Sequence, residues 1–168
     1  MGNEYELVLT REFKAPRDVV YKMWKEAEHL EKWWSPKGFG MEVHQFDFQP
    51  DGIFHYSQTS PDGQKLWGKF VYEEMKEPEK LNFRNAFSDE EGRTIRAPFS
   101  STWPLEIRNT LIFEDNGNHT IVKAVGVPVN ASEEELEAFK AMHENMKQGF
   151  GGTFDQLDNY LAERNRGE

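Results

Sequence analysis

The feature that most constrains the fold is a long row of apolar residues at helical spacing near the C-terminus. Between Leu136 and Leu161 these residues recur every three or four positions, as on one face of an α-helix. Ser132 and Glu135 have the spacing of a capping box at its start. The pattern predicts one long helix within Asn130–Glu168, in which about thirty residues would span roughly 45 Å. A helix of that length needs a large apolar surface to cover. The row consists of Leu136, Phe139, Met142, Met146, Phe150, Phe154, Leu157 and Leu161.

The residues before this helix show the alternation of apolar and polar side chains that is typical of β-strands. Two short helices, around Val20–Ala27 and Glu28–Trp34, are predicted after the first strand. The turn Asp115–Asn118 indicates a hairpin. The expected strands are Tyr5–Thr10, Met41–Phe48, Ile53–Thr59, Leu66–Met75, Leu81–Phe87, Leu105–Glu114 and Thr120–Val129. This order predicts an α+β fold, in which an antiparallel sheet of about seven strands carries the C-terminal helix on one face.

One connection, Ser88–Pro104, is longer than most loops in compact domains and has no clear periodicity. It carries Ile95, Phe99 and Trp103 among polar residues. Large apolar side chains in a long loop indicate either a packed flap or a movable lid.

Length and charge limit the classes of function. With 168 residues and no linker-like segment, residues 1–168 are expected to form a single domain with a real core. A net charge of -10 disfavours nucleic acid, because phosphates would be repelled. The absence of cysteine excludes disulfides and thiolate metal sites. No apolar stretch reaches ~18 residues and no signal-peptide pattern is found, so a cytoplasmic protein without membrane insertion is expected.

Aromatic residues make up 14% of a chain whose mean hydropathy is -0.82. A polar chain with so many rings has to concentrate them, either in a packed core or in a pocket. If the sheet curves away from the long helix, a cavity opens between the two layers.

Short motifs spread over nearly the whole chain have a characteristic order and spacing. They are Arg11-Glu12-Phe13-Lys14-Ala15-Pro16, Val19-Val20, Trp24, Trp33-Trp34-Ser35-Pro36, Asp47 with Pro50-Asp51-Gly52, Trp67-Gly68-Lys69-Phe70, Ser88-Asp89-Glu90-Glu91-Gly92 and Gly149-Phe150. Together they resemble the START-like proteins of the SRPBCC superfamily. The nearest branch resembles the C-terminal domain of the heat-shock-90 ATPase activator. One turn departs from the family pattern, because Asp51-Gly52 stands where Gly-Gly is usual.

The resemblance implies a helix-grip fold, which is a curved seven-stranded antiparallel sheet wrapped around the C-terminal helix. Related proteins bind lipids, sterols, polyketides or other apolar molecules in the cavity, and some are cyclases. The resemblance transfers no catalytic residue to this chain, and neither a cofactor nor a metal site is predicted.

The residues expected to line such a cavity are inward-facing apolar side chains with a few polar ones among them. An unpartnered buried amide costs roughly 1–3 kcal/mol, so an Asn in an apolar row needs a protein, water or ligand partner. Each of these residues can alternatively be part of an ordinary packed core. A shift of one residue in strand register would also turn the inward-facing side chains of that strand to the other face of the sheet. The predicted ligand-binding residues are Trp34, Phe54, Tyr56, Trp67, Phe83, Asn85, Phe99, Trp103, Asn109, Met142, Met146 and Phe150.

Three glycines interrupt the predicted long helix, and each costs about 0.8–1 kcal/mol relative to alanine. Gly149, Gly151 and Gly152 therefore predict a kink or the close approach of another backbone. Alternatively they form a weak joint that lets the cavity open.

Two histidines, His44 and His55, are expected near each other across the first hairpin. Two histidines without a third ligand are only weak support for a metal site. No HExxH pattern, GxSxG elbow, phosphate loop or dinucleotide fingerprint occurs.

Three functions are compatible with these patterns. The favoured one is binding of a small apolar or aromatic molecule between sheet and helix, with the loops Ser88–Pro104 and Pro36–Gly40 as a gate. The second is docking on a chaperone or another partner protein, which predicts a filled core and an exposed apolar patch. The third is a cyclase or hydrolase, which needs a titratable group of shifted pKa inside the cavity. A non-enzymatic role is favoured, because none of the 30 carboxylates stands out as catalytic. The ligand and the oligomeric state stay open.

Overall fold

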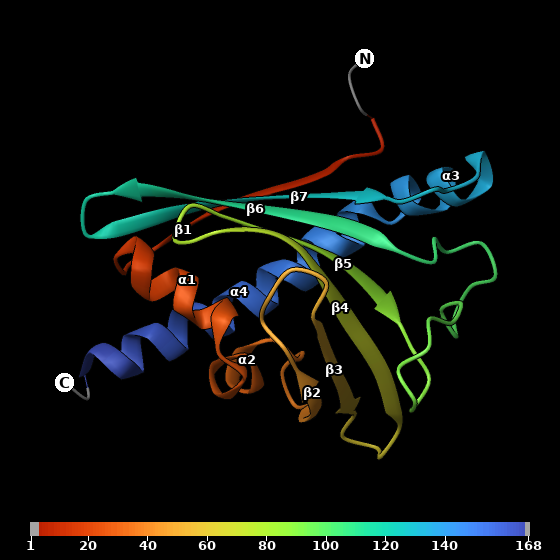
Figure 1. The fold of residues 1–168 in the computed structure, drawn as a ribbon, viewed down its shortest axis with the longest axis horizontal. Helices are drawn as coiled ribbons and strands as arrows, with labels where there is room; N and C mark the ends of the chain where they lie inside the picture. The colour runs from red at the N-terminus through yellow and green to blue at the C-terminus, as the bar shows by residue number, and fades with distance from the viewer. Residues whose placement is uncertain (1–3, 167–168) are drawn as a thin grey trace.

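The computed structural model describes residues 4–166, which form one seven-stranded sheet and four helices (Figure 1). The strands are β1 (Leu7–Phe13), β2 (Gly40–Phe46), β3 (Ile53–Thr59), β4 (Lys65–Lys76), β5 (Lys80–Phe87), β6 (Ile107–Asn116) and β7 (His119–Pro128). The helices are α1 (Arg17–Lys25), α2 (Ala27–Trp33), α3 (Glu133–Ala141) and α4 (His143–Arg166). The predicted α+β class and order of elements are confirmed. The ends of the predicted domain and helix, residues 1–3 and 167–168, lie outside the described residues.

The sheet is curved around α4. Its strand order is β1-β7-β6-β5-β4-β3-β2, and all neighbouring strands are antiparallel. Register breaks between Val43 and Gln45 and between Tyr72 and Met75 mark irregularities of the kind that bend a strand. In Figure 1, β1, β7 and β6 run across the top, whereas β2, β3 and β4 turn downwards. This is the predicted helix-grip arrangement.

The prediction of one uninterrupted C-terminal helix is wrong. Met142, with φ -97° and ψ 3°, separates α3 from α4. Phe139 of α3 packs in a cluster with Leu7 and Ile107, whereas Leu157 of α4 packs in the main core. Because the sheet curves, two shorter helices can cover both apolar regions and one straight helix cannot. The capping box of Ser132 and Glu135 at the start of α3 is confirmed.

The three helical glycines do not interrupt the helix. The helix α4 runs without interruption through Gly149, Gly151 and Gly152. A Cβ atom at any of these positions would meet no other atom of residues 4–166 within 4 Å, so no second backbone from that part of the chain approaches there. The break between the two C-terminal helices lies at Met142. The glycines reduce the bulk of α4 along this stretch.

The core beneath α1, α2 and α4 is built mainly of aromatic rings. Trp24 is 1% exposed, and its ring centroid lies 4.7 Å from that of Trp33, 5.4 Å from Phe113 and 6.5 Å from Phe154. All three contacts are edge-on, the geometry that adds about 0.5–1.5 kcal/mol per pair beyond burial. These rings join α1, α2, β6 and α4 in one unit.

Polar contacts fix the rotation of α4 against the sheet. Arg11 of β1 bonds to Asp155 at 2.6 Å and to Asp158 at 2.5 Å. On the other side, the Gln156 amide donates to the carbonyl oxygens of Trp33 at 3.3 Å and Ser35 at 2.6 Å. The two sets of contacts determine which residues of α4 face the sheet.

The turn before β3 explains the departure from the Gly-Gly pattern. Asp51 adopts a left-handed conformation with φ 68°, which aspartate tolerates better than most residues. A Cβ atom at Gly52 would lie 2.0 Å from the carbonyl oxygen of Asp47, so only the second glycine is required there.

None of the helices in the described part of the chain combines the length and apolar character needed to span a lipid bilayer.

A buried histidine links α2 to α4. His29 is 5% exposed; its Nδ1 lies 2.7 Å from the Tyr160 hydroxyl and its Nε2 lies 3.0 Å from a Glu26 carboxylate oxygen. Burial, together with the positive charge of Arg164, lowers the pKa of His29 below its ordinary 6.5. The neutral imidazole fits the site, since it offers one acceptor and one donor.

We expect this histidine to make the fold less stable in acid. Below about pH 6.5 the unfolded chain takes up a proton at residue 29 more readily than the folded protein does, so the free energy of unfolding falls until the pH passes below the folded pKa. Urea unfolding at pH 7.5 and 5.5 should show a smaller loss for His29→Gln than for the wild type. Equal losses in the two proteins would contradict this.

Candidate functional site

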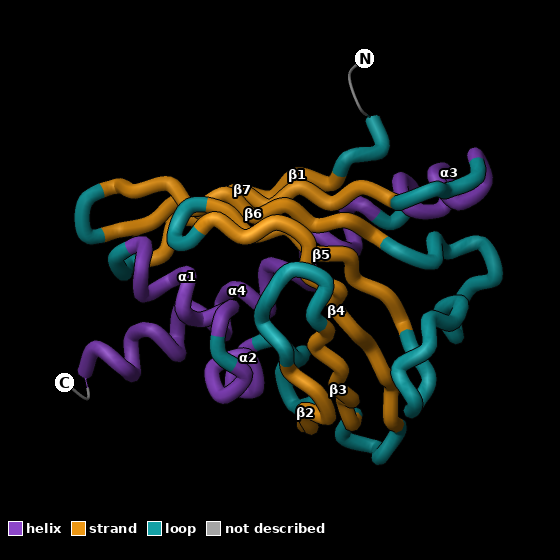
Figure 2. The backbone as a smooth tube through the Cα atoms, viewed as in Figure 1, coloured by secondary structure: helices purple, strands orange, loops and turns teal. Residues whose placement is uncertain are grey.

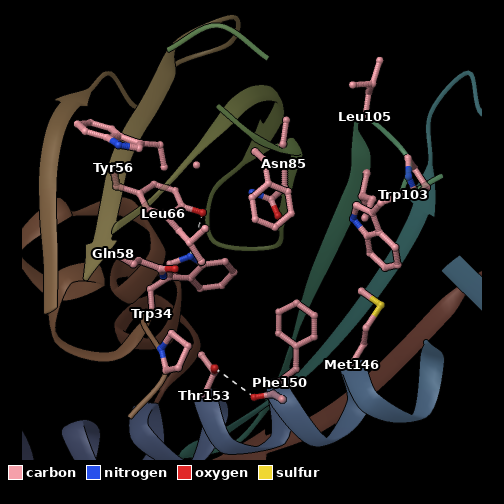
Figure 3. Close-up of a pocket in the computed structure, with 18 residues that line it drawn as sticks. Trp34, Tyr56, Gln58, Leu66, Asn85, Trp103, Leu105, Met146, Phe150 and Thr153 are labelled. Carbon is pink, nitrogen blue, oxygen red and sulfur yellow. Dashed lines mark hydrogen bonds between the residues drawn. The ribbon is translucent and has the colours of Figure 1, made fainter. Parts of the chain in front are cut away.

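A cavity of about 300 Å³ lies between the concave face of the sheet and α4. In Figure 3, Met146 and Phe150 rise from α4 towards Asn85, with Trp34 on one side and Trp103 on the other. Known ligand pockets measure about 300–1,000 Å³, so this cavity stands at the lower end of that range. Its lining residues are Trp34, Pro36, Tyr56, Gln58, Leu66, Trp67, Gly68, Asn85, Ala86, Phe87, Trp103, Pro104, Leu105, Ile107, Met146, Gly149, Phe150 and Thr153.

The polar end of the cavity centres on Tyr56. The Trp34 indole nitrogen donates to the Tyr56 hydroxyl oxygen at 3.4 Å, and the Asn85 amide donates to the Lys69 carbonyl at 3.1 Å. Burial raises the pKa of Tyr56, and hydrogen bonds from Trp34 and Asn85 act in the opposite direction with smaller effect. The phenol is therefore protonated at neutral pH.

A glycine on the neighbouring strand makes room for this hydroxyl. Tyr56 of β3 is paired with Gly68 of β4. A Cβ atom at Gly68 would lie 2.8 Å from the Tyr56 hydroxyl oxygen, closer than real contacts allow. Gly68 therefore positions the Tyr56 ring over β4, as strand glycines do where another group approaches closely.

The long connection between β5 and β6 packs down as a flap. Arg96 donates to the Trp103 carbonyl oxygen at 2.8 Å and forms an ion pair with Glu135 at the start of α3. Trp103 is 7% exposed, and its ring lies 5.6 Å from that of Phe139. This connection is the loop drawn in teal at the right of Figure 2. The flap closes one side of the cavity.

Most of the residues predicted for the cavity are found around it. Seven of them line it: Trp34, Tyr56, Trp67, Asn85, Trp103, Met146 and Phe150. Phe83 and Asn109 line a neighbouring space of about 30 Å³, which has room for little more than water. Trp34 and Phe150 border both spaces and form the wall between them.

Trp67 borders the cavity, but its indole lies on the opposite, convex face of the sheet. Side chains alternate along a strand, and its neighbour Gly68 lies beneath the Tyr56 ring on the concave face. The Trp67 ring lies 4.6 Å from that of His44 and 5.4 Å from that of His55. Its ring therefore does not face the cavity.

The remaining three predicted residues line neither the cavity nor the neighbouring space. Phe54 is fully buried in the core. Phe99 is 63% exposed on the flap, where its ring lies 5.7 Å from Phe87 and 5.6 Å from Trp103. Met142 stands at the break between α3 and α4 and packs against the cluster around Phe139. The break explains its position, because it interrupts the single helix face on which the prediction rested.

Several residues that line the cavity were not predicted from the sequence. Gln58 continues the alternation of Tyr56 along β3, and its paired residue Leu66 lies opposite it on β4. That period could have identified both residues. Leu105 begins the predicted strand Leu105–Glu114 and shares the two-residue period of Asn109, so the same period could have identified it, although β6 itself begins at Ile107. Gly149 has no side chain and gave no signal as a lining residue.

The cavity has no acid–base pair. Among its lining residues in the described chain, Tyr56 is the sole titratable side chain, and burial keeps it protonated. General acid–base catalysis uses groups with a pKa near the working pH. The lining offers no such group.

The two histidines that were expected together lie 5.5 Å apart, ring centre to ring centre. Nε2 of His44 lies 2.9 Å from the Ser57 hydroxyl, and Nε2 of His55 lies 3.2 Å from the Asp89 carbonyl oxygen. Both nitrogens are thus engaged by the protein.

The one metal-like grouping of three found in the described residues is Glu26, Glu28 and His29. Both ring nitrogens of His29 already have partners, in Tyr160 and Glu26. The grouping is therefore accounted for by contacts within the protein.

Solved bacterial structures share this architecture. Protein Ms6760 from Mycobacterium smegmatis is 27% identical with a TM-score of 0.77, over 94% of this chain and 91% of that one. A protein from Arthrobacter aurescens is 26% identical with a TM-score of 0.79, and the match covers 95% of this chain and 87% of that protein. The AHSA1 protein from Silicibacter pomeroyi shares the fold. It is 19% identical with a TM-score of 0.70, and the match covers 95% of this chain and 99% of that protein.

The comparison with curated proteins gives no match. The family model described as "Activator of Hsp90 ATPase homolog 1-like protein" matches residues 14–162, and the chain therefore belongs to this family, within the SRPBCC superfamily.

Proposed function

We propose that this protein binds one small apolar or aromatic molecule in the cavity between the sheet and α4. The observation that carries the proposal is the cavity itself, with about 300 Å³ of space walled by Trp34, Trp103, Met146 and Phe150. Transfer of an apolar molecule from water to such walls is favourable by about 25 cal/mol per Å² of buried surface. Polar side chains at one end would orient the ligand, and the flap would act as its gate.

The proposal predicts that purified protein binds the uncharged fluorescent probe N-phenyl-1-naphthylamine with a stoichiometry of one to one. The probe's emission should rise and shift to shorter wavelength, because its surroundings become apolar. Native mass spectrometry of freshly purified protein should also show a fraction carrying a bound small molecule. A protein that is free of bound molecules and leaves the probe's emission unchanged would count against the proposal.

A second candidate is docking on a chaperone or another partner protein, and exposed apolar residues near the cavity mouth favour it. Phe99 is 63% exposed, Leu105 42% and Leu66 39%. If the exposed apolar residues form a docking surface, Phe99→Ser would weaken capture of a chaperone in a pull-down, whereas a substitution inside the cavity would not. Capture that is insensitive to Phe99→Ser would remove the support for this surface.

A further inference from the structure

The side chains that line the cavity contain no formal charge. Tyr56 is their sole titratable member within the described chain, and no Asp, Glu, Lys, Arg or His is among them. An ion entering the cavity would give up its water without meeting a counter-charge. The net charge of -10 adds a further barrier against anions.

The hydrogen bonds at the polar end leave the Tyr56 O–H group without an acceptor. The hydroxyl oxygen accepts from the Trp34 indole, and the Asn85 side chain also hydrogen-bonds to this oxygen, which opposes the rise that burial causes in the pKa of Tyr56. Both contacts are directed at the oxygen, so the hydroxyl proton needs a separate acceptor, and none is found among the described residues. Tyr56 is 6% exposed, and burial raises its pKa, so the O–H group persists at neutral pH.

The neighbouring amides complete the pattern. The Asn85 amide donates one N–H to the Lys69 carbonyl and also hydrogen-bonds to the Tyr56 oxygen, and the Gln58 amide donates one of its two N–H groups to the Ser35 hydroxyl. The carbonyl oxygens of both amides have no donor among the described residues. Such oxygens repel a carboxylate and accept from a hydroxyl group, so an uncharged oxygen function fits beside Tyr56.

We infer that the ligand is an uncharged, largely apolar molecule whose carbonyl or hydroxyl oxygen accepts a hydrogen bond from Tyr56, while its apolar body lies among Trp34, Trp103 and Phe150. The inference rests on the proposed function and adds the chemical class of the ligand. It also assigns Tyr56 as the residue that selects this class.

Displacement of bound N-phenyl-1-naphthylamine by four naphthalenes of similar shape tests the inference. These probes are 2-acetylnaphthalene, 2-ethylnaphthalene, 2-naphthoate and the 2-naphthyltrimethylammonium ion. The ketone should bind about five- to tenfold more tightly than the ethyl compound, the effect of one neutral hydrogen bond. Both ions should bind more weakly than the ketone.

Two tyrosine variants show whether the preference comes from residue 56. Tyr56→Phe is expected to abolish the preference for the ketone over the ethyl compound. Tyr72→Phe is the matched control, because Tyr72 is likewise a buried tyrosine, lies outside the cavity lining and has a hydroxyl with no hydrogen-bond partner among the described residues. It should keep the preference. If Tyr56→Phe does not fold, the order of the four probes on the wild type decides by itself.

The outcomes separate the two proposals. Equal binding of ketone and ethyl compound, tighter binding of either ion, or a preference that survives Tyr56→Phe would overturn the inference and leave the proposed function standing. If N-phenyl-1-naphthylamine and all four naphthalenes fail to bind, the proposed function itself fails.

Discussion

Replacement of Gly149 by leucine is expected to weaken binding of N-phenyl-1-naphthylamine strongly while making the fold more stable. Met146, Gly149, Phe150 and Thr153 lie on one face of α4 and line the cavity. A Cβ atom at Gly149 would meet nothing within 4 Å, so the added side chain enters open space. We expect affinity to fall at least about tenfold, or 1.4 kcal/mol. Leucine should also stabilise the helix by about 0.5–1 kcal/mol relative to glycine.

Gly152→Leu is the matched control for this variant. Gly152 belongs to the same helix, is exposed, and has no atom within 4 Å of its ideal Cβ position, but it does not line the cavity. It should gain the same helix stability and keep wild-type affinity. Fluorescence titration and urea unfolding measure the two quantities. Probe binding that Gly149→Leu leaves unchanged would place the ligand elsewhere.

Replacement of Trp24 by alanine is expected to have the largest effect on the fold. Its ring contacts Trp33, Phe113 and Phe154, so its removal loosens α1, α2, β6 and α4 together. Truncation of a fully buried tryptophan typically costs about 3–5 kcal/mol, because the lost contacts leave a void. Domains of this size have a total stability of about 5–15 kcal/mol, so much of the protein's stability would be lost.

Urea unfolding of Trp24→Ala measures this loss, and Trp67→Ala serves as its control. The Trp67 ring lies on the convex face of the sheet and is only partly buried, so its removal should cost less than about half as much, in proportion to the area buried. If Trp24→Ala cannot be purified, Trp24→Phe should still show a measurable loss. Equal losses for Trp24→Ala and Trp67→Ala would contradict the assignment of Trp24 to the central contact of the core.

Local patterns predicted the elements well, and they failed where distant segments meet. The two-residue period of β3 placed Tyr56 on the same face as Phe54, and the spacing of Ser132 and Glu135 marked the start of α3. The break at Met142 had no local signal. It arises because α3 and α4 pack on different parts of a curved sheet.

In the candidate site, too, local patterns predicted some residues correctly and failed where the contacts are between distant segments. Residues in strands of clear period, such as Tyr56 and Asn85, were assigned to the cavity from the sequence and line it. Trp67 was assigned by residue type, yet its ring lies on the other face, because alternation from Gly68 fixes its direction. Gly149 could not be found, since its role is to leave space.

The sequence alone determined the order of the helices and strands, the turn at Gly52 and the charge balance, because each depends on neighbours within a few residues. The tertiary structure alone decided the break at Met142, the face of Trp67 and the volume between α4 and the sheet. These depend on register and curvature, which arise from contacts between residues far apart in the chain. A cavity is the space that those contacts leave unfilled, so no local pattern encodes it.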